Sequence, residues 1–313
     1  MADDATGNSI QINARSVTVV SILSVAYLLL SILLVGFKSD QVILIVLFNA
    51  AFYASAISRK FILGFSIFIF YWVLFDYMKV IPNYKVNAVH IADLYNCEKS
   101  LFGINFHGKI LTPNEYWVVN GTSFLDVITG LFYLCWIPVP LAFAGYLFFK
   151  NRREFLYFAF TFLLVNLIGF VIYYLYPAAP PWYVQQHGFV FHPLTMGSTG
   201  GLAKFDAHFH INLFKSIYAK GSNVFAAMPS LHSAYPVIVL FYGFRNRLGL
   251  ANIFFAIVVL GIWFTAVYAS HHYVLDVLAG ITCAIIGISL FRLMATRSKS
   301  IIAWLDKYEA VIK

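Results

Sequence analysis

Long, uninterrupted apolar runs are the feature that most restricts how this chain folds. Of its 313 residues, 61% are hydrophobic and only 11% are charged. A water-soluble domain could not hide that much apolar surface, because its outer shell faces water. Inside lipid, backbone groups must bond to one another, which leaves helices or a closed barrel. The runs are too long for period-two strands, so the sequence predicts an all-α, polytopic membrane helix bundle.

Eight apolar stretches are candidate membrane spans. They cover residues 17–37, 42–57, 61–81, 124–149, 155–176, 234–244, 250–269 and 273–293. A spanning helix needs about 20 apolar residues, so the second and sixth stretches are short. The sixth reaches full length only as a helix from about Pro229 to about Leu248. Its polar start must then be shielded by protein or face a cavity.

Short basic connections set the expected orientation. Basic residues follow the second, fourth, sixth and eighth spans: Arg59, Lys60, Lys150, Arg152, Arg153, Arg245, Arg247, Arg292, Arg297 and Lys299. The positive-inside rule puts these connections and both termini in the cytoplasm. Residues 82–123, residues 177–228 and the turn at 269–272 then face outward. No basic run is interleaved with aromatic residues, so nucleic acid is not an expected partner.

Two polar segments interrupt the apolar pattern, and helix geometry predicts that they meet. His232 lies in MPSLHSAYP, and His272 and Asp276 lie in YASHHYVLD. At 1.5 Å per residue, about 20 residues cross about 30 Å, so one span down and one span back returns the chain to the same face. Residues four apart share a helix face, so the Asp276 carboxylate can bond one nitrogen of His272 and fix its tautomer.

These side chains together favour phosphoryl transfer. An imidazole paired with a carboxylate is a good nucleophile or base, and a second imidazole can act as acid toward a leaving oxygen. Pro229 and Ser230 suit the start of a helix, whose free N–H groups attract an anion. Other interpretations stay open at this point: histidines that are merely packed at an interface, Ser230 as a helix cap only, or a transporter whose histidines relay protons.

Four short motifs then carry a resemblance to a known family. PSLHSAYP and HHYVLDVLAG resemble the second and third signature motifs of the type 2 phosphatidic acid phosphatase superfamily. YPAAPPWY (176–183) and GGLAKFD (200–206) narrow the resemblance to its inositol phosphorylceramide synthase branch, the fungal sphingolipid enzymes and their bacterial relatives. The resemblance implies that His272 is the nucleophile, His232 the acid and Asp276 the group that orients His272. The reaction it implies passes through a phosphohistidine and needs no metal or other cofactor.

The chain also departs from the phosphatases of that superfamily. Their KxxxxxxRP motif is missing, and YPAAPPWY stands in the region where it would fall. Thr265 and Ala266 occupy the places of the Ser-Arg pair that precedes the phosphatase histidine. A phosphomonoester carries up to two negative charges near neutral pH and a diester carries one, so fewer cations predict a diester donor.

The phosphate and the lipid need further contacts. Candidates for holding the phosphate are Ser230, His271, Lys204, Lys215 and Lys220, with Lys204 favoured among the lysines because it lies within GGLAKFD. A second group is expected to shape the rim of the pocket: Pro180, Pro181, Trp182 and Tyr183. His208 and His210 lack a carboxylate or cysteine set, so no metal site is assigned to them.

The sequence therefore predicts a sphingolipid synthase in the bilayer, with a phosphatidylinositol-like donor, a ceramide-like acceptor and diacylglycerol as by-product. A lipid phosphatase that uses water is the alternative. The predicted regions are N-terminal spans (1–81), an extracytoplasmic loop or interfacial cap (82–123), a catalytic membrane core (124–293) and a cytoplasmic tail (294–313). A six-helix phosphatidic-acid-phosphatase-like core is expected within the bundle, with the active site facing outward. Head group, acyl chains and oligomeric state stay open.

Overall fold

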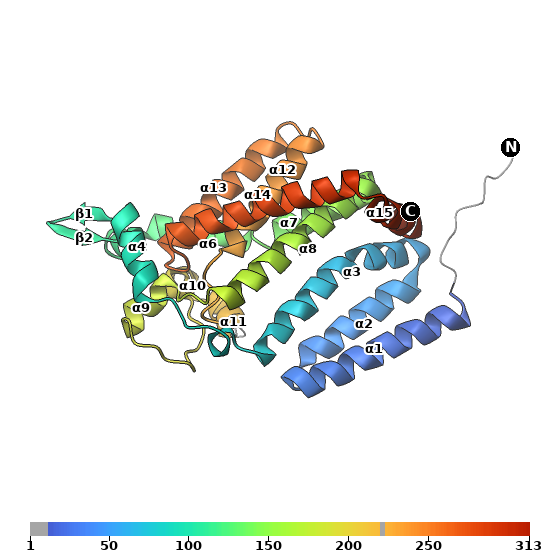
Figure 1. Ribbon diagram of the computed structural model, residues 1–313, viewed down its shortest axis with the longest axis horizontal. Coiled ribbons are helices and arrows are strands. Elements are labelled where there is room, and N and C mark those ends of the chain that lie inside the picture. The colour runs from blue at the N-terminus through green and yellow to red at the C-terminus, as the bar shows by residue number, and fades with distance from the viewer. Residues whose placement is uncertain (1–11, 220–222) are drawn as a thin grey trace. The chain divides into compact units, whose positions relative to one another are not determined.

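A computed structural model describes residues 12–219 and 223–313 of the chain (Figure 1). Apart from one short hairpin, its regular structure in these residues is helical, so the predicted all-α class is confirmed. The chain divides into two compact units, which are described separately. One unit holds residues 1–80, 144–163 and 291–313, and the other holds residues 81–143 and 164–290. Three helices contribute residues to both units: α7 (Pro138–Lys150), α8 (Arg152–Leu175) and α14 (Val274–Arg297).

The first unit is built from helices at both ends of the chain. Its own helices are α1 (Ala14–Val35), α2 (Ser39–Ala54), α3 (Ala56–Tyr77) and α15 (Lys299–Ile312), with a 3₁₀ turn at Met78–Val80. Ser55 starts α3 because its hydroxyl accepts the Ser58 N–H, which satisfies one free donor of the first turn. Phenylalanines fill the interior, and Phe65 stacks on Phe155 with ring centroids 5.5 Å apart.

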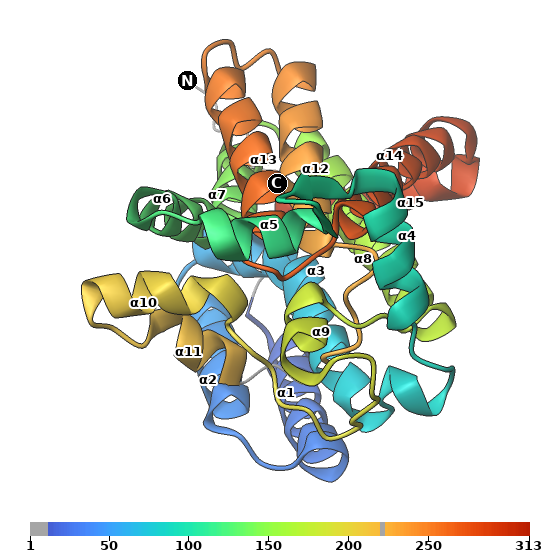
Figure 2. The same ribbon diagram turned by 90° about the vertical axis from the view of Figure 1, so that its left-hand side faces the viewer.

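The second unit contains both polar motifs. Its elements are a 3₁₀ turn at Asn83–Lys85, α4 (Ala92–Phe102), β1 (Ile104–Phe106), β2 (Lys109–Leu111), α5 (Pro113–Asn120), α6 (Ser123–Leu134), α9 (Pro181–His187), a 3₁₀ turn at Gly200–Leu202, α10 (Ala203–Phe209), α11 (Leu213–Ala219), α12 (Leu231–Arg245) and α13 (Ala251–Tyr268). The strands form an antiparallel hairpin that pairs Ile104 with Leu111. Figures 1 and 2 both show α12 and α13 lying side by side.

The expected spans are found as helices, with two informative differences. Within the described residues, six helical stretches are long and apolar enough to cross a membrane, when α6 and α7 are counted together as one stretch, Ser123–Lys150. The stretch at 124–149 is broken near Cys135, where α6 ends and α7 begins after a short turn. α12 has 15 residues and stops at Arg245, so the sixth stretch does not extend to Leu248 as a helix. The Leu248 N–H instead bonds back to the Gly243 carbonyl, and Gly249 adopts φ +56°, which turns the chain into α13.

Candidate active site

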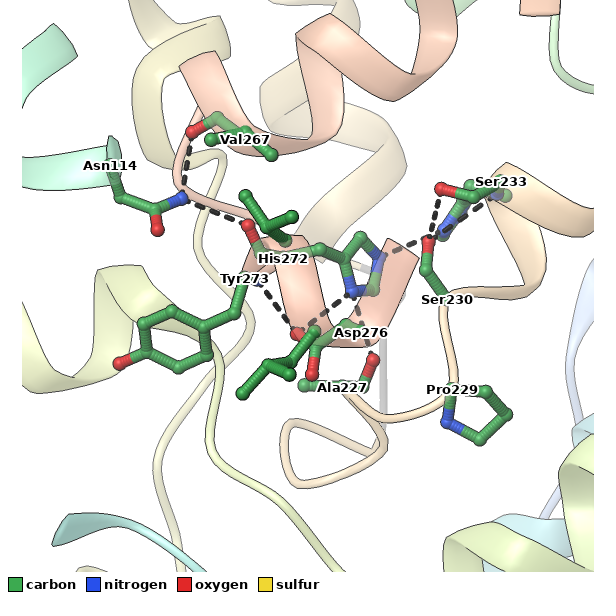
Figure 3. Close-up of polar contacts among 12 residues, drawn as sticks. Asn114, Ala227, Pro229, Ser230, Ser233, Val267, His272, Tyr273 and Asp276 are labelled. Atoms are coloured by element: carbon green, nitrogen blue, oxygen red, sulfur yellow. Dashed lines mark hydrogen bonds and ion pairs between the residues drawn. The ribbon is translucent and has the colours of Figure 1, made fainter. Parts of the chain in front are cut away.

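His232 and His272 lie side by side although 40 residues separate them. His232 is in the first turn of α12. His272, labelled in Figure 3, is in the turn between α13 and α14. Nδ1 of His232 lies 3.3 Å from Nε2 of His272. The round trip through α12 and α13 therefore brings the two motifs together, as helix counting predicts.

The second ring nitrogen of His272 has two oxygen neighbours. Nδ1 lies 2.9 Å from the Ala227 carbonyl oxygen and 3.6 Å from Oδ2 of Asp276. A carbonyl oxygen can only accept, so Nδ1 carries the proton and Nε2 keeps its lone pair toward His232. The sequence predicted the carboxylate as the bonding partner, but the carbonyl is closer. The reason is that α14 begins at Val274, so His272 precedes the helix on which a four-residue spacing would apply.

Asp276 is fully buried and connects the two motifs through its backbone and side chain. Its Oδ2 accepts the Tyr273 N–H at 2.8 Å, and its backbone carbonyl accepts the Ser230 N–H at 2.9 Å. Ser230 is also buried, and its hydroxyl accepts the Ser233 N–H at 3.3 Å as the N-cap of α12. The starts of α12 and α14 are thus joined directly. A contact between the Ser230 hydroxyl and a phosphate stays a prediction.

Burial keeps the imidazoles of the turn neutral. It lowers the pKa of His272 to about 4, although the Ala227 carbonyl bond opposes the change. Burial and the neighbouring His272 and His232 rings lower the pKa of His271 to about 3. A neutral His272 has the free lone pair that a nucleophile requires.

His271 contacts protein on two sides. Its Nε2 lies 2.9 Å from the Thr199 carbonyl, and its ring stacks on Tyr218 at 4.6 Å between centroids. These contacts tie the histidine turn to the GGLAKFD segment, where the Gly201 N–H also donates to the Ala269 carbonyl at 2.8 Å. In the structure His271 is an anchor of the turn, and its contact with phosphate stays a prediction.

Two aromatic residues beside His232 lie outside the four sequence motifs and were not predicted as site residues. The Trp136 ring meets His232 edge-on at 4.4 Å between centroids, and Tyr133 lies 5.4 Å from it. Both come from the end of α6 and the turn after it. The sequence does contain a sign of the break in the helix beside these residues, because Pro138 and Pro140 interrupt an otherwise continuous apolar run.

The aromatic segment 180–183 lies in the core. Pro180, Pro181, Trp182 and Tyr183 are all buried. The Trp182 N–H donates to the Ser270 carbonyl at 2.9 Å, and the Tyr183 hydroxyl donates to the Val190 carbonyl at 2.7 Å. Trp182 therefore supports the histidine turn through the backbone of Ser270. The expected contact of all four residues with substrate stays a prediction.

The lysine candidates lie elsewhere. Lys204 is half exposed, and its Nζ lies 3.8 Å from Oδ1 of Asp126, which also accepts the Tyr268 hydroxyl at 2.7 Å. Lys215 is exposed on α11, and Lys220 lies outside the described residues. A phosphate contact by any of these lysines is therefore still a prediction.

Comparison with known proteins decides the family. Residues 103–290 match the family model of the PAP2 superfamily. The chain belongs to the PAP2 superfamily. The matched range contains the two histidines and Asp276, and it confirms the family inferred from the motifs.

Individual relatives show which members of the superfamily this chain is similar to. A Bacteroides thetaiotaomicron protein named phosphoinositol dihydroceramide synthase is 41% identical over 96% of this chain and 98% of its own length. The inositol phosphorylceramide synthase of Candida albicans is 28% identical over 80% of this chain. The catalytic subunit of the Saccharomyces cerevisiae enzyme is 29% identical over 67%. The chain spans about half the length of these two fungal relatives. No solved structure matches the chain.

Proposed function

We propose that this protein is a sphingolipid synthase that moves a phospho-head group from a glycerophospholipid to the hydroxyl of a ceramide-like lipid. One structural observation carries the proposal: Nε2 of His272 faces His232 at 3.3 Å while its Nδ1 lies 2.9 Å from the Ala227 carbonyl oxygen, the partner that leaves Nε2 as the nitrogen with a lone pair. A nucleophile next to a second imidazole is the arrangement that two-step group transfer needs. The names of the bacterial and fungal relatives support the same class of reaction.

In the first step, the donor phosphate binds between the His232 and His272 rings and takes the place of their direct contact. Nε2 of His272 attacks phosphorus, and the bond from phosphorus to the diacylglycerol oxygen breaks. His232 enters this step as the imidazolium, protonated when the anionic donor binds beside it, and donates that proton to the oxygen. Diacylglycerol therefore leaves as a neutral alcohol and His232 is left as a neutral imidazole. The His272 ring is left as an imidazolium whose Nε2 carries the phospho-head group as a phosphoramidate, and the Asp276 carboxylate, 3.6 Å from Nδ1, stabilises its positive charge.

In the second step, the acceptor hydroxyl approaches the same phosphorus. His232, now unprotonated, takes the hydroxyl proton as the new oxygen–phosphorus bond forms. The bond from Nε2 to phosphorus breaks and returns His272 to its starting state. Donor and acceptor use one site in turn, which predicts ping-pong kinetics.

The donor is a phosphodiester lipid, with phosphatidylinositol as the best choice. Support comes from Thr265 and Ala266, which occupy the positions of the Ser-Arg pair of the phosphatases. Ala266 is fully buried, and its carbonyl accepts the N–H groups of both His271 and His272. The Thr265 hydroxyl is used within the bundle, donating to the Gly261 carbonyl at 2.7 Å. Neither Thr265 nor Ala266 supplies a cation at these positions, which supports a diester donor over a phosphomonoester and the phosphatase alternative.

The active site is proposed to face away from the cytoplasm, with both termini in the cytoplasm. The basic residues between spans support this orientation. In oriented vesicles, a membrane-impermeant thiol reagent would label Cys97, an exposed residue of α4, only from the outer side. Labelling from the cytoplasmic side alone would reverse the assignment.

The activity itself is tested by reconstituting the purified protein with phosphatidylinositol and a fluorescent ceramide. Thin-layer chromatography should show a new polar ceramide product, and the His272→Ala variant, folded but inactive, should show none. Free inositol phosphate without a ceramide product would support the phosphatase alternative. No turnover of any diester lipid would remove the enzyme assignment.

A further inference from the structure

Two buried polar residues outside the signature motifs bond to the backbone around His272. Glu98, on α4, and Asn114, on α5, are both fully buried. Neither was a candidate from the sequence, which offered residues 82–123 only as a loop or cap. Each of the two side chains bridges two backbone groups in or beside the turn that carries His272, next to the start of α14 that carries Asp276.

Asn114 joins the end of α13 to His272 itself. Its Nδ2 donates to the Val267 carbonyl at 2.8 Å and to the His272 carbonyl at 2.9 Å (Figure 3). The Val267 carbonyl, in the last turn of α13, also accepts the Ser270 N–H at 3.0 Å. A single amide group therefore fixes the distance between the end of α13 and His272.

Glu98 closes the start of α14. Oε1 accepts the Val274 N–H at 2.9 Å, and Oε2 accepts the Leu275 N–H at 3.1 Å. Asp276 accepts the preceding Tyr273 N–H. Three consecutive donors at this helix start are thus satisfied by two carboxylates, which leaves the Asp276 side chain held beside His272.

The two helices that carry Glu98 and Asn114 are themselves joined. Thr112 and Glu115 form a capping box around Pro113 and Asn114, with the Thr112 N–H donating to Glu115 at 2.8 Å. The other Glu115 oxygen accepts the Tyr95 hydroxyl of α4 at 2.8 Å. Glu98 and Asn114 are therefore carried by two helices, α4 and α5, that are hydrogen-bonded to each other.

We propose that Glu98 and Asn114 are positioning residues for the transfer reaction, holding the backbone of residues 267–275 so that Nε2 of His272 faces the phosphorus. The proposal rests on the function proposed above, since it assigns them to the same site. The hydrogen bonds that the described residues show for both side chains go to backbone groups, so these side chains act through the backbone and through Asp276. Loss of either should lower kcat and leave KM for both lipids unchanged.

The charge of Glu98 gives a readout that a purely structural role would not. Burial raises the pKa of Glu98 to about 7, the two N–H bonds oppose the rise, and the Asp276 carboxylate adds to it. Tyr273 is the other titratable group that senses this charge. Only the ionised carboxylate accepts both N–H groups with full strength, so kcat should rise with pH through about 7.

The experiment compares Glu98→Gln and Asn114→Ala with matched controls from the same helices. Asp93→Asn replaces an exposed carboxylate of α4, and Asn120→Ala removes an amide that bonds only within α5, to Tyr116. Each variant is assayed with phosphatidylinositol and fluorescent ceramide, and its thermal unfolding is recorded in detergent. We expect kcat to fall about 10- to 100-fold in the two test variants, by misplacement of the nucleophile, and to stay near wild type in the controls.

The pH profile completes the test. Wild-type kcat should show a limb near pH 7 that is absent from Glu98→Gln. Wild-type kcat in both test variants, or a limb that persists in Glu98→Gln, would overturn the proposal. An Asn114→Ala protein that does not fold leaves the Glu98→Gln profile to decide, because glutamine keeps the side-chain shape. If the proposed function is wrong, the wild type itself makes no ceramide product. If only the positioning role of Glu98 and Asn114 is wrong, the wild type is active and His272→Ala is inactive.

Discussion

The Ser230 carbonyl of the α12 start packs directly against Gly280 of α14. A Cβ added at Gly280 would lie 2.1 Å from the Ser230 carbonyl oxygen, a distance that real Cβ atoms do not reach. The contact is backbone against backbone, so no side-chain rotation can relieve it. This close approach holds the helix with His232 against the helix with Asp276.

Gly280→Ala is therefore predicted to separate the two motifs. The added methyl group must push α14 away from α12 and lengthen the distance between His232 and His272, so the synthase activity should fall by about 100-fold or more. Thermal stability should fall as well, because overpacking costs about 1–3 kcal/mol. Gly145→Ala in α7 is the control, since nothing lies within 4 Å of a Cβ there. Full activity in Gly280→Ala would show that the packing does not set the site.

His232→Ala is predicted to be rescued by a donor that needs no protonation. With phosphatidylinositol the variant should lose about 10²- to 10⁴-fold in rate, the usual contribution of a general acid. A nitrophenyl phosphodiester of inositol has a leaving group that departs without a proton, so formation of the His272 adduct should return toward the wild-type rate. An equal loss with both donors would contradict the role of His232 as acid.

Asp276→Asn should be less damaging than His272→Ala. The Ala227 carbonyl at 2.9 Å still holds Nδ1–H in the variant, so the ring keeps its tautomer. Only the charge that stabilises the imidazolium is lost, and we expect a fall in kcat of about 10- to 1,000-fold. Steady-state rates of the two variants decide the point. If Asp276→Asn is as inactive as His272→Ala, the carboxylate and not the carbonyl holds the ring.

The acid dependence of stability should reflect His272. Its pKa is lowered from an ordinary value of 6.5 to about 4 in the folded protein. The unfolded chain therefore binds more protons between these values, and the contribution of this group is lost as pH falls from 6.5 toward 4. The thermal midpoint of wild type should drop over this window more than that of His272→Gln, whose side chain does not titrate. Parallel curves for the two proteins would contradict the burial of a neutral His272.

The sequence predicted those parts of the site that depend on length and periodicity. The apolar runs gave the spans, and counting residues through two of them brought His232 to His272. The sequence does not reveal contacts made by backbone groups, such as the Ala227 carbonyl. Every residue carries the same carbonyl group, so no residue type marks the one that bonds to His272. Glu98 and Asn114 were missed for another reason, because in sequence they look like solvated loop residues. Only the folded segment 82–123 buries them, Glu98 against the start of α14 and Asn114 against the end of α13 and His272. The half-exposed Lys204 shows the converse, since its place in a motif did not reveal its pairing with Asp126.

The central claim is that the head group passes through His272, and trapping that adduct tests it most directly. The purified protein is incubated with phosphatidylinositol labelled in the inositol phosphate and with no acceptor, then digested and analysed by mass spectrometry. We expect an acid-labile inositol phosphate on the peptide containing His272 of wild type, its absence from His272→Ala, and its discharge when ceramide is added. A labelled wild type whose adduct lies on another residue, or product formation by His272→Ala, would contradict the account.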